Sequence, residues 1–187
     1  MDAVHLWKSY GSRLVLRDLS FSAYPGVTCI EAPSGGGKTT LLRIVLGLEK
    51  ADRGRVEGLE GARLAAVFQE DRLLLHATAL ENLAFVRPGE EEAAAELLEE
   101  LGLPLSGQPV GEFSGGMRRR VALARALAAP SDALVLDEPF TGLDRESRAA
   151  CLACLRRRGE GKVVLLASHN PQDARELDAR VIRLPVI

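Results

Sequence analysis

The chain has 187 residues, of which 47% are hydrophobic and 27% charged, and this ordinary globular usage excludes a disordered or fibrous protein. The length suits a single domain, and 24 basic against 26 acidic side chains give a formal net charge of −2, without the basic excess of a general nucleic-acid binder. Three scattered cysteines exclude a disulfide framework, and we find neither a signal peptide nor an apolar run of the ~20 residues that span a bilayer. We therefore expect a cytoplasmic protein with no nucleic-acid partner.

In chain order, short apolar runs alternate with helical patterns. A β-prone run at 27–31 leads into a glycine-rich turn, and an apolar-periodic segment then predicts a helix that begins at Lys38. Similar runs predict strands at 64–68, 133–137, 163–168 and 181–184, and helical patterns predict helices at 90–101, 116–129, 144–158 and 171–177. Strands that alternate with helices predict an α/β fold with a largely parallel central sheet.

Two further features of this pattern concern the helices. The helix at 171–177 has favourable start chemistry, with Asn170 as N-cap, Pro171 at the first helical position and Asp173 near the positive helix end. Residues from about 71 to 129 carry helix signals without a clear strand. We therefore expect a helical subdomain at about 71–129, inserted into a core made of residues of about 1–70 and 130–187.

The strongest local motif is A-P-S-G-G-G-K-T-T, between the first predicted parallel strand and its helix. We expect nucleotide phosphates to bind to this segment, which consists of Ala32, Pro33, Ser34, Gly35, Gly36, Gly37, Lys38, Thr39 and Thr40. The glycines let successive N–H groups point inward as an anion-binding nest, and the helix adds its positive N-terminus. Lys38 is expected to reach the β- and γ-phosphates, and the Thr39 hydroxyl to coordinate Mg²⁺.

One residue departs from the pattern G-x-x-x-x-G-K-[ST], because Ala32 stands where the first glycine is expected. Alanine is tolerable there if its φ is negative, and otherwise costs roughly 1 kcal/mol or more. The alternative interpretation is a flexible glycine-rich turn with an accidental Lys-Thr pair. The strand–turn–helix context favours the phosphate site.

A second motif, A-L-V-L-D-E-P, ends a predicted apolar strand with two carboxylates. Asp137, at the strand terminus, can hold Mg²⁺ opposite Thr39, and Glu138 is placed to polarise a water for attack on the γ-phosphate. The alternative is a solvated turn, since acidic residues commonly end strands. The phosphate motif upstream favours the catalytic interpretation.

The remaining motifs resemble those of the ATP-binding cassette (ABC) ATPases, over almost the whole chain. The segment F-S-G-G-M-R-R-R-V-A-L-A-R-A-L at 113–127 resembles the family's signature segment. Gln69 in V-F-Q-E-D resembles the Q-loop glutamine, and Asp144, which ends T-G-L-D, resembles the D-loop aspartate. His169 in A-S-H-N-P resembles the switch histidine, and Tyr10 in K-S-Y-G stands where the family places an aromatic residue against adenine.

The resemblance implies a P-loop NTPase core with an N-terminal antiparallel β part, and an ATPase that uses ATP and Mg²⁺. Two cassettes would face head to tail, so that Ser114, Gly115, Gly116 and Met117 bind the γ-phosphate held by the partner's Lys38. Each site would combine one chain's Lys38, Thr39, Gln69, Asp137, Glu138 and His169 with the partner's Ser114, and Thr39, Gln69 and Asp137 would hold the metal. Met117 replaces the family's usual glutamine. This difference puts a side-chain contact from that position in doubt, but it does not affect phosphate binding by the backbone N–H groups.

Several residues have simpler interpretations. Trp7 is the nearby alternative to Tyr10 for adenine stacking, although packing suits it better. The basic run at 118–120 with Arg125 is interpreted as a solvated helix face rather than a nucleic-acid contact. Cys151 and Cys154 form C-x-x-C without a second pair, so an amphipathic helix is favoured over a metal or redox site. The acidic run at 90–100 is interpreted as a solvated helix face.

The resemblance implies the ATPase subunit of a transporter, peripheral on the inner face of the cell membrane and docked on separate permease subunits. Residues 68–83 resemble the same stretch of bacterial importers of nitrate, sulfonate or taurine type, although Leu75 and His76 replace the usual proline and aromatic residue. The alternative is a soluble ABC ATPase that acts as a mechanical switch, but the second cassette or long coiled-coil insertion of those proteins does not occur here. A P-loop kinase or GTPase would leave S-G-G-M-R-R-R unexplained.

Overall fold

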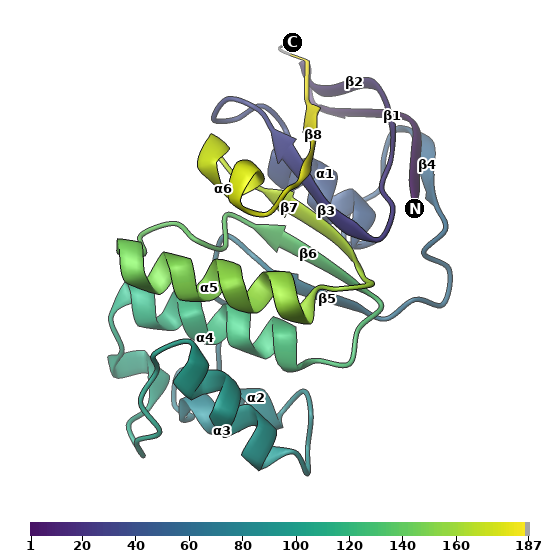
Figure 1. The fold of residues 1–187 in the computed structure, drawn as a ribbon. Coiled ribbons are helices and arrows are strands. Elements are labelled where there is room, and N and C mark those ends of the chain that lie inside the picture. The colour runs from purple at the N-terminus through teal and green to yellow at the C-terminus, as the bar shows by residue number, and fades with distance from the viewer. Residues whose placement is uncertain (186–187) are drawn as a thin grey trace.

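The computed structural model describes residues 1–185 and contains two β-sheets (Figure 1). The antiparallel sheet has the strand order β2-β1-β4, with β1 at Asp2–Tyr10, β2 at Arg13–Ser22 and β4 at Arg53–Glu57. The parallel sheet has the order β5-β6-β7-β3-β8, with β3 at Gly26–Glu31, β5 at Leu64–Val67, β6 at Ala133–Asp137, β7 at Val163–Ala167 and β8 at Arg180–Arg183. This confirms the predicted α/β fold with a parallel central sheet and an N-terminal antiparallel part.

The helices are α1 at Lys38–Val45, α2 at Ala79–Ala84, α3 at Glu91–Glu100, α4 at Gly115–Ala128, α5 at Arg145–Arg158 and α6 at Pro171–Glu176, with a 3-10 turn at Val110–Glu112. Five of the helices match predicted ones in order, whereas α2 had no predicted range of its own within the helix-rich segment at about 71–129. Asn170 caps α6 as predicted, because its side chain accepts a hydrogen bond from the N–H of Gln172. Cys151 and Cys154 are buried on the inner face of α5, which confirms their packing role.

The parallel sheet separates two hydrophobic clusters. On β6, Leu134 and Leu136 point into a cluster shared with α4 and α5, whereas Val135 points into one shared with α1 and the antiparallel sheet. Strands that are covered on both faces read as continuous apolar runs, which is why β6 is fully buried. Since β3 and β6 both run parallel to β7, the end of β6 and the start of α1, which follows β3, lie at the same edge of the sheet.

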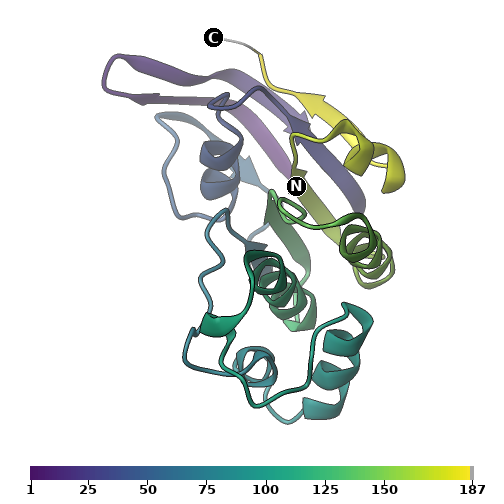
Figure 2. The same cartoon turned by 90° about the vertical axis from the view of Figure 1, so that its left-hand side faces the viewer.

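Helices α2 and α3 lie at the end of the molecule away from the β1–β2 hairpin, beside α4 (Figure 2). Their buried side chains, such as Leu83 and Leu97, belong to the same cluster as Leu123 of α4 and Leu134 of the sheet. Most of the acidic side chains of α3 are exposed, as expected. A division at about 71–129 stays a prediction, since one hydrophobic core runs across it.

Within residues 1–185, none of the helices combines the length and the apolar composition that crossing a membrane requires.

Candidate nucleotide site

A cavity of about 470 Å³ opens where α1 begins and where β6 ends. Its lining comprises Tyr10, Arg13, Val15, Ser34, Gly35, Gly36, Gly37, Lys38, Thr39, Thr40, Gln69, Asp137 and Glu138. The structure thus brings together both predicted motifs, the glutamine and the tyrosine, although they lie far apart in the sequence. Trp7 is not part of this lining, whereas Tyr10 is.

The glycine-rich turn has no room for side chains. Gly37 caps α1 with a φ of 89°, and a Cβ there would approach the Val15 carbonyl oxygen to 3.0 Å. A Cβ on Gly36 would lie 2.9 Å from the Cβ of Ala32. Within residues 1–185, Ala32 is not among the non-glycine residues with positive φ, so its departure from the motif carries no backbone strain.

The carboxylate of Asp137 lies beside the start of α1. Its Oδ2 accepts a hydrogen bond of 2.7 Å from the Thr39 hydroxyl, while its buried Oδ1 has no hydrogen-bond partner among the described residues. Burial raises the pKa of Asp137, against the opposing effects of the Thr39 hydrogen bond and of the positive charges of Lys38 and Arg119. A buried carboxylate oxygen of this kind is chemically suited to bind a cation.

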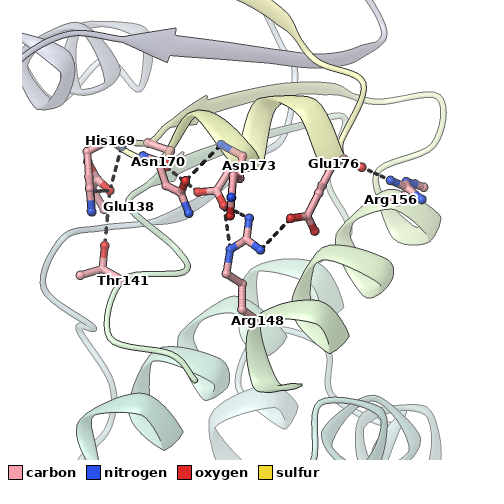
Figure 3. A network of polar contacts seen from close by, with 10 residues as sticks. Glu138, Thr141, Arg148, Arg156, His169, Asn170, Asp173 and Glu176 are labelled. Atoms are coloured by element: carbon pink, nitrogen blue, oxygen red, sulfur yellow. Dashed lines mark hydrogen bonds and ion pairs between the residues drawn. The ribbon is translucent and has the colours of Figure 1, made fainter. Parts of the chain in front are cut away.

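Glu138 adopts a left-handed backbone conformation with a φ of 52°, a strained geometry for a residue with a side chain. Its Oε1 lies 3.7 Å from Lys38 Nζ, which also donates to the carbonyl of Ala32 at 2.9 Å. Its Oε2 lies 2.6 Å from His169 Nδ1 and accepts a 3.3 Å hydrogen bond from the Thr141 hydroxyl (Figure 3). The glutamate is therefore held between the phosphate turn and the histidine.

The loop that carries His169 is fixed by a buried ion pair (Figure 3). Arg148 Nε on α5 donates to Asp173 Oδ1 at 2.9 Å, and the Asp173 side chain is only 3% exposed. Ser168 donates its hydroxyl proton to Asp173 Oδ2 at 2.5 Å and accepts a hydrogen bond from the N–H of Asn170. Because Ser168 and Asn170 flank His169, the ion pair positions the histidine relative to α5.

The arginines of α4 correct one prediction. A solvated face is predicted at 118–120 with Arg125, but these side chains are part-buried and donate to backbone carbonyls: Arg118 to that of Phe113, just before the helix, and the other three to segments further away in the sequence. Arg125 donates to the Arg72 carbonyl at 2.8 Å, and burial lowers its pKa. The prediction was wrong because the acceptors are backbone carbonyls outside the helix, 50–54 residues away in sequence for Arg119 and Arg125, and helical periodicity gives no sign of them.

The signature residues lie outside the cavity. Ser114 caps α4 by accepting a hydrogen bond of 3.2 Å from the N–H of Met117. Ser114 and Gly115 are exposed, and a Cβ on Gly116 would lie 3.5 Å from the Gly142 carbonyl oxygen. Asp144 caps α5 through the N–H and hydroxyl of Ser147. These residues form one exposed edge, so they do not join the phosphate turn within a single chain.

Two predicted residues and two unpredicted ones complete the site. Ala32 and Pro33 line a neighbouring hollow with His169 instead of the main cavity. Arg13 and Val15 line the cavity, and Arg13 Nη2 donates to the Gly35 carbonyl at 3.2 Å. The signal that could have identified them is their position just after Tyr10, across the turn of the β1–β2 hairpin.

Comparisons with known proteins identify a family for the whole chain. A family model described as ABC transporter matches residues 16–141, more than half of the chain. The chain is 40% identical to the aliphatic sulfonates import ATP-binding protein SsuB 1 of Rhodococcus jostii, over 98% of its own length and 78% of that protein. It is 37% identical to the sulfate/thiosulfate import ATP-binding protein CysA of Methylococcus capsulatus, over 96% of its own length but only 59% of that relative.

Solved structures show the same similarity. The dimeric structure of MJ0796, a bacterial ABC transporter cassette, matches with a TM-score of 0.85 and 26% identity, over 98% of this chain and 93% of that chain. The dimer of the same cassette in a post-hydrolysis state, bound to ADP and Pi, matches with a TM-score of 0.83 and 27% identity over the same shares.

Proposed function

This chain belongs to the ABC transporter family and is an ATP-binding, ATP-hydrolysing cassette of that family, and we propose that it powers import through separate membrane-spanning subunits. The single observation that supports the site best is the convergence of Lys38, Thr39, Asp137 and Glu138 on one cavity from two distant motifs. A flexible turn or a solvated strand end would not produce this convergence.

The residues of the cavity fit a magnesium ion. The Thr39 hydroxyl and Asp137 supply hard oxygen ligands, and the unpartnered Asp137 Oδ1 is a position that a cation would satisfy. Gln69 lines the same cavity and can offer a further oxygen. When bound, Mg²⁺ would neutralise the charge that develops on the phosphate oxygens during hydrolysis.

The protein groups divide the remaining work. The glycine turn and the N-terminus of α1 bind the phosphates, and Lys38 is free to exchange its contact with the Ala32 carbonyl for the β- and γ-oxygens. Glu138 orients and deprotonates the attacking water, and His169 holds that carboxylate in place. Tyr10, which is 48% exposed at the cavity edge, stacks on adenine.

The second protomer would complete each site. Ser114 and the backbone of Gly115, Gly116 and Met117 lie on an exposed edge of this chain, beside the D-loop. They are available to the γ-phosphate of a partner cassette and not to their own. ATP would therefore hold a head-to-tail dimer together, and hydrolysis would allow the two chains to separate.

Lys38→Ala tests the phosphate site. Hydrogen bonds to charged groups contribute about 1.5–3 kcal/mol, so ATP affinity should fall about 10–150-fold, with hydrolysis lost at cellular ATP concentrations. Isothermal titration with ATP and a phosphate-release assay would measure both, with the exposed Lys50→Ala as a matched control. Near-wild-type turnover of Lys38→Ala would mean that residues 32–40 are not the catalytic cradle.

Import is proposed because the relatives reported above are named as import ATP-binding proteins for sulfonates and for sulfate. Their names favour a transporter subunit over a soluble mechanical switch, and a peripheral place on the inner face of the cell membrane follows from docking on permease subunits. Deleting the gene should reduce uptake of radiolabelled alkanesulfonate or sulfate, and the wild-type gene, but not Lys38→Ala, should restore it. Unchanged uptake of both solutes would remove the support for this substrate class.

A further inference from the structure

Arg119 connects α4 to the segment that follows β5. Its Nη1 donates to the carbonyl of Phe68 at 2.7 Å, and its Nη2 donates to the carbonyl of Gln69 at 2.6 Å. Nη1 also lies 3.3 Å from Asp71 Oδ1, which adds an opposite charge. The side chain of Arg119 is only 12% exposed, so these contacts form in a largely desolvated position.

The chemistry of this contact is specific to arginine. A guanidinium presents two terminal NH₂ groups in a planar fork, which matches two consecutive carbonyl oxygens, whereas a lysine ammonium is a single point charge. Arg125 adds a donor to the carbonyl of Arg72, so the helix holds this segment at both ends. Gln69 is thereby fixed by its backbone at a position where it lines the nucleotide cavity.

We propose that Arg119 is a positioning residue for Gln69: by clamping the carbonyls of Phe68 and Gln69, it holds the glutamine side chain in the nucleotide cavity. This inference rests on the proposed role of Gln69 at the magnesium and γ-phosphate site. In this arrangement α4 would contact both nucleotide sites of a dimer. The helix begins at Ser114, which faces a partner's ATP, and Arg119 lies little more than one turn further along.

Because the helix is rigid, a displacement of Ser114 by a partner's phosphate would also displace the Arg119 guanidinium. Gln69 would follow, since its carbonyl is held at 2.6 Å. The two nucleotide sites of a dimer would then be linked through one helix, from the phosphate of one site to the glutamine of the other.

The neighbouring Arg120 provides a matched control. Its Nη1 also donates to two backbone carbonyls, of Leu101 at 2.8 Å and Gly102 at 2.9 Å, but these lie at the end of α3, away from the cavity. Arg119→Gln and Arg120→Gln thus remove the same kind of contact from adjacent positions of one helix. A purely structural role would give both variants similar consequences.

The first readout is hydrogen–deuterium exchange of the nucleotide-free chain. Arg119→Gln should speed exchange in peptides that cover residues 68–72, and Arg120→Gln should do so in peptides around residues 101–103. If Arg119→Gln leaves the exchange of residues 68–72 unchanged, the clamp does not order that segment and the proposal is wrong.

The second readout is a double-mutant cycle with Gln69→Ala. Loss of a residue that orients a ligand typically costs about 10–100-fold, so kcat of Arg119→Gln should fall by this factor. Gln69→Ala should then add less than about threefold, whereas in the Arg120→Gln background it should have its full effect. Arg119→Lys, which keeps the charge, should fall between wild type and Arg119→Gln, and it takes the place of that variant in both readouts if Arg119→Gln does not fold.

Two results would separate the failures. A wild-type chain that does not hydrolyse ATP would remove the proposed function itself. An active wild type with additive effects of Arg119→Gln and Gln69→Ala would leave that function intact and overturn only the role of Arg119.

Discussion

Asp137 combines a proposed role in magnesium binding with a cost to the stability of the nucleotide-free fold. The carboxylate is 4% exposed and has one unpartnered oxygen, and its burial raises its pKa. A carboxyl group whose pKa is higher in the folded state than in the unfolded state contributes stability at low pH. That contribution is lost as the pH rises through the folded-state pKa. At neutral pH, therefore, the charge of Asp137 destabilises the chain unless a cation is bound.

Asp137→Asn should stabilise the nucleotide-free chain at pH 7 by on the order of 1 kcal/mol, because it removes a buried charge, while it abolishes magnesium-dependent hydrolysis. Urea unfolding in EDTA from neutral to acidic pH would measure the free energy of unfolding. The advantage of the variant should shrink as the pH falls through the raised pKa of the wild-type carboxyl, which then binds its proton. A variant that is less stable than wild type at pH 7 would show that Lys38 and Arg119 already compensate the charge.

At the scale of elements, the N-terminus of α4 has a structural and a proposed functional role. The Ser114 hydroxyl oxygen accepts a hydrogen bond from the Met117 N–H, and Ser114 itself is exposed. Loss of such a cap costs about 1 kcal/mol, and a substitution by a residue that cannot cap the helix, such as arginine, carries this loss. An experiment on dimerisation must therefore include a control variant that loses the N-cap of a different helix.

Ser114→Arg should leave ATP binding by the isolated chain unchanged but block ATP-dependent pairing, because a bulky cation would fill the place of the partner's γ-phosphate. Nucleotide affinity and light scattering with ATP would measure the two effects. Thr78→Arg is the matched control, since Thr78 caps α2 through a capping box. If Ser114→Arg still dimerises and hydrolyses ATP as Thr78→Arg does, the shared-site arrangement is incorrect.

The same scale shows which elements could be predicted. The parallel strands and long helices are marked by local chemistry, such as the Asn170 cap and the apolar run of β6. The antiparallel sheet is not, because its pairing depends on register shifts near His5 and Asp18, both with positive φ. Gly54 must be a glycine, since a Cβ there would lie 2.2 Å from the His5 carbonyl oxygen. These are contacts between distant residues, which a local pattern does not contain.

The site divides in the same way. The phosphate turn and the acidic pair are contiguous motifs whose residue types state their chemistry, and the structure places them in one cavity. The supporting residues Arg148, Thr141 and Arg119 were missed. The partners of Arg148 and Arg119 are distant in the sequence. Thr141 reaches Glu138, which has a strained backbone conformation. Glu138 itself depends on a φ of 52°, which its identity does not indicate.

At the scale of the whole molecule, the catalytic cavity and the signature edge are separate surfaces of one chain. The cavity contains Lys38 and Glu138, whereas Ser114 lies on the exposed edge beside Gly142. In the proposed head-to-tail arrangement, two copies of a chain with both surfaces would be complementary to each other and would close as a symmetric dimer with two identical sites. Such a dimer would last as long as ATP remains intact in the sites.

Glu138→Gln separates dimerisation from hydrolysis. Glutamine keeps the size of the side chain, and loss of the 3.7 Å ion pair with Lys38 releases that lysine for the phosphates, so ATP should bind at least as well. Hydrolysis should slow by about 10²–10⁴-fold, because a neutral amide is a poor base for the attacking water. The closed pair should then accumulate, so the variant should elute as an ATP-dependent dimer on gel filtration. Wild type should remain mostly monomeric, and so should the control Glu57→Gln, which makes the same substitution on β4. An active Glu138→Gln enzyme would instead assign the base to another residue, and His169, whose Nδ1 lies 2.6 Å from Glu138, is the first candidate.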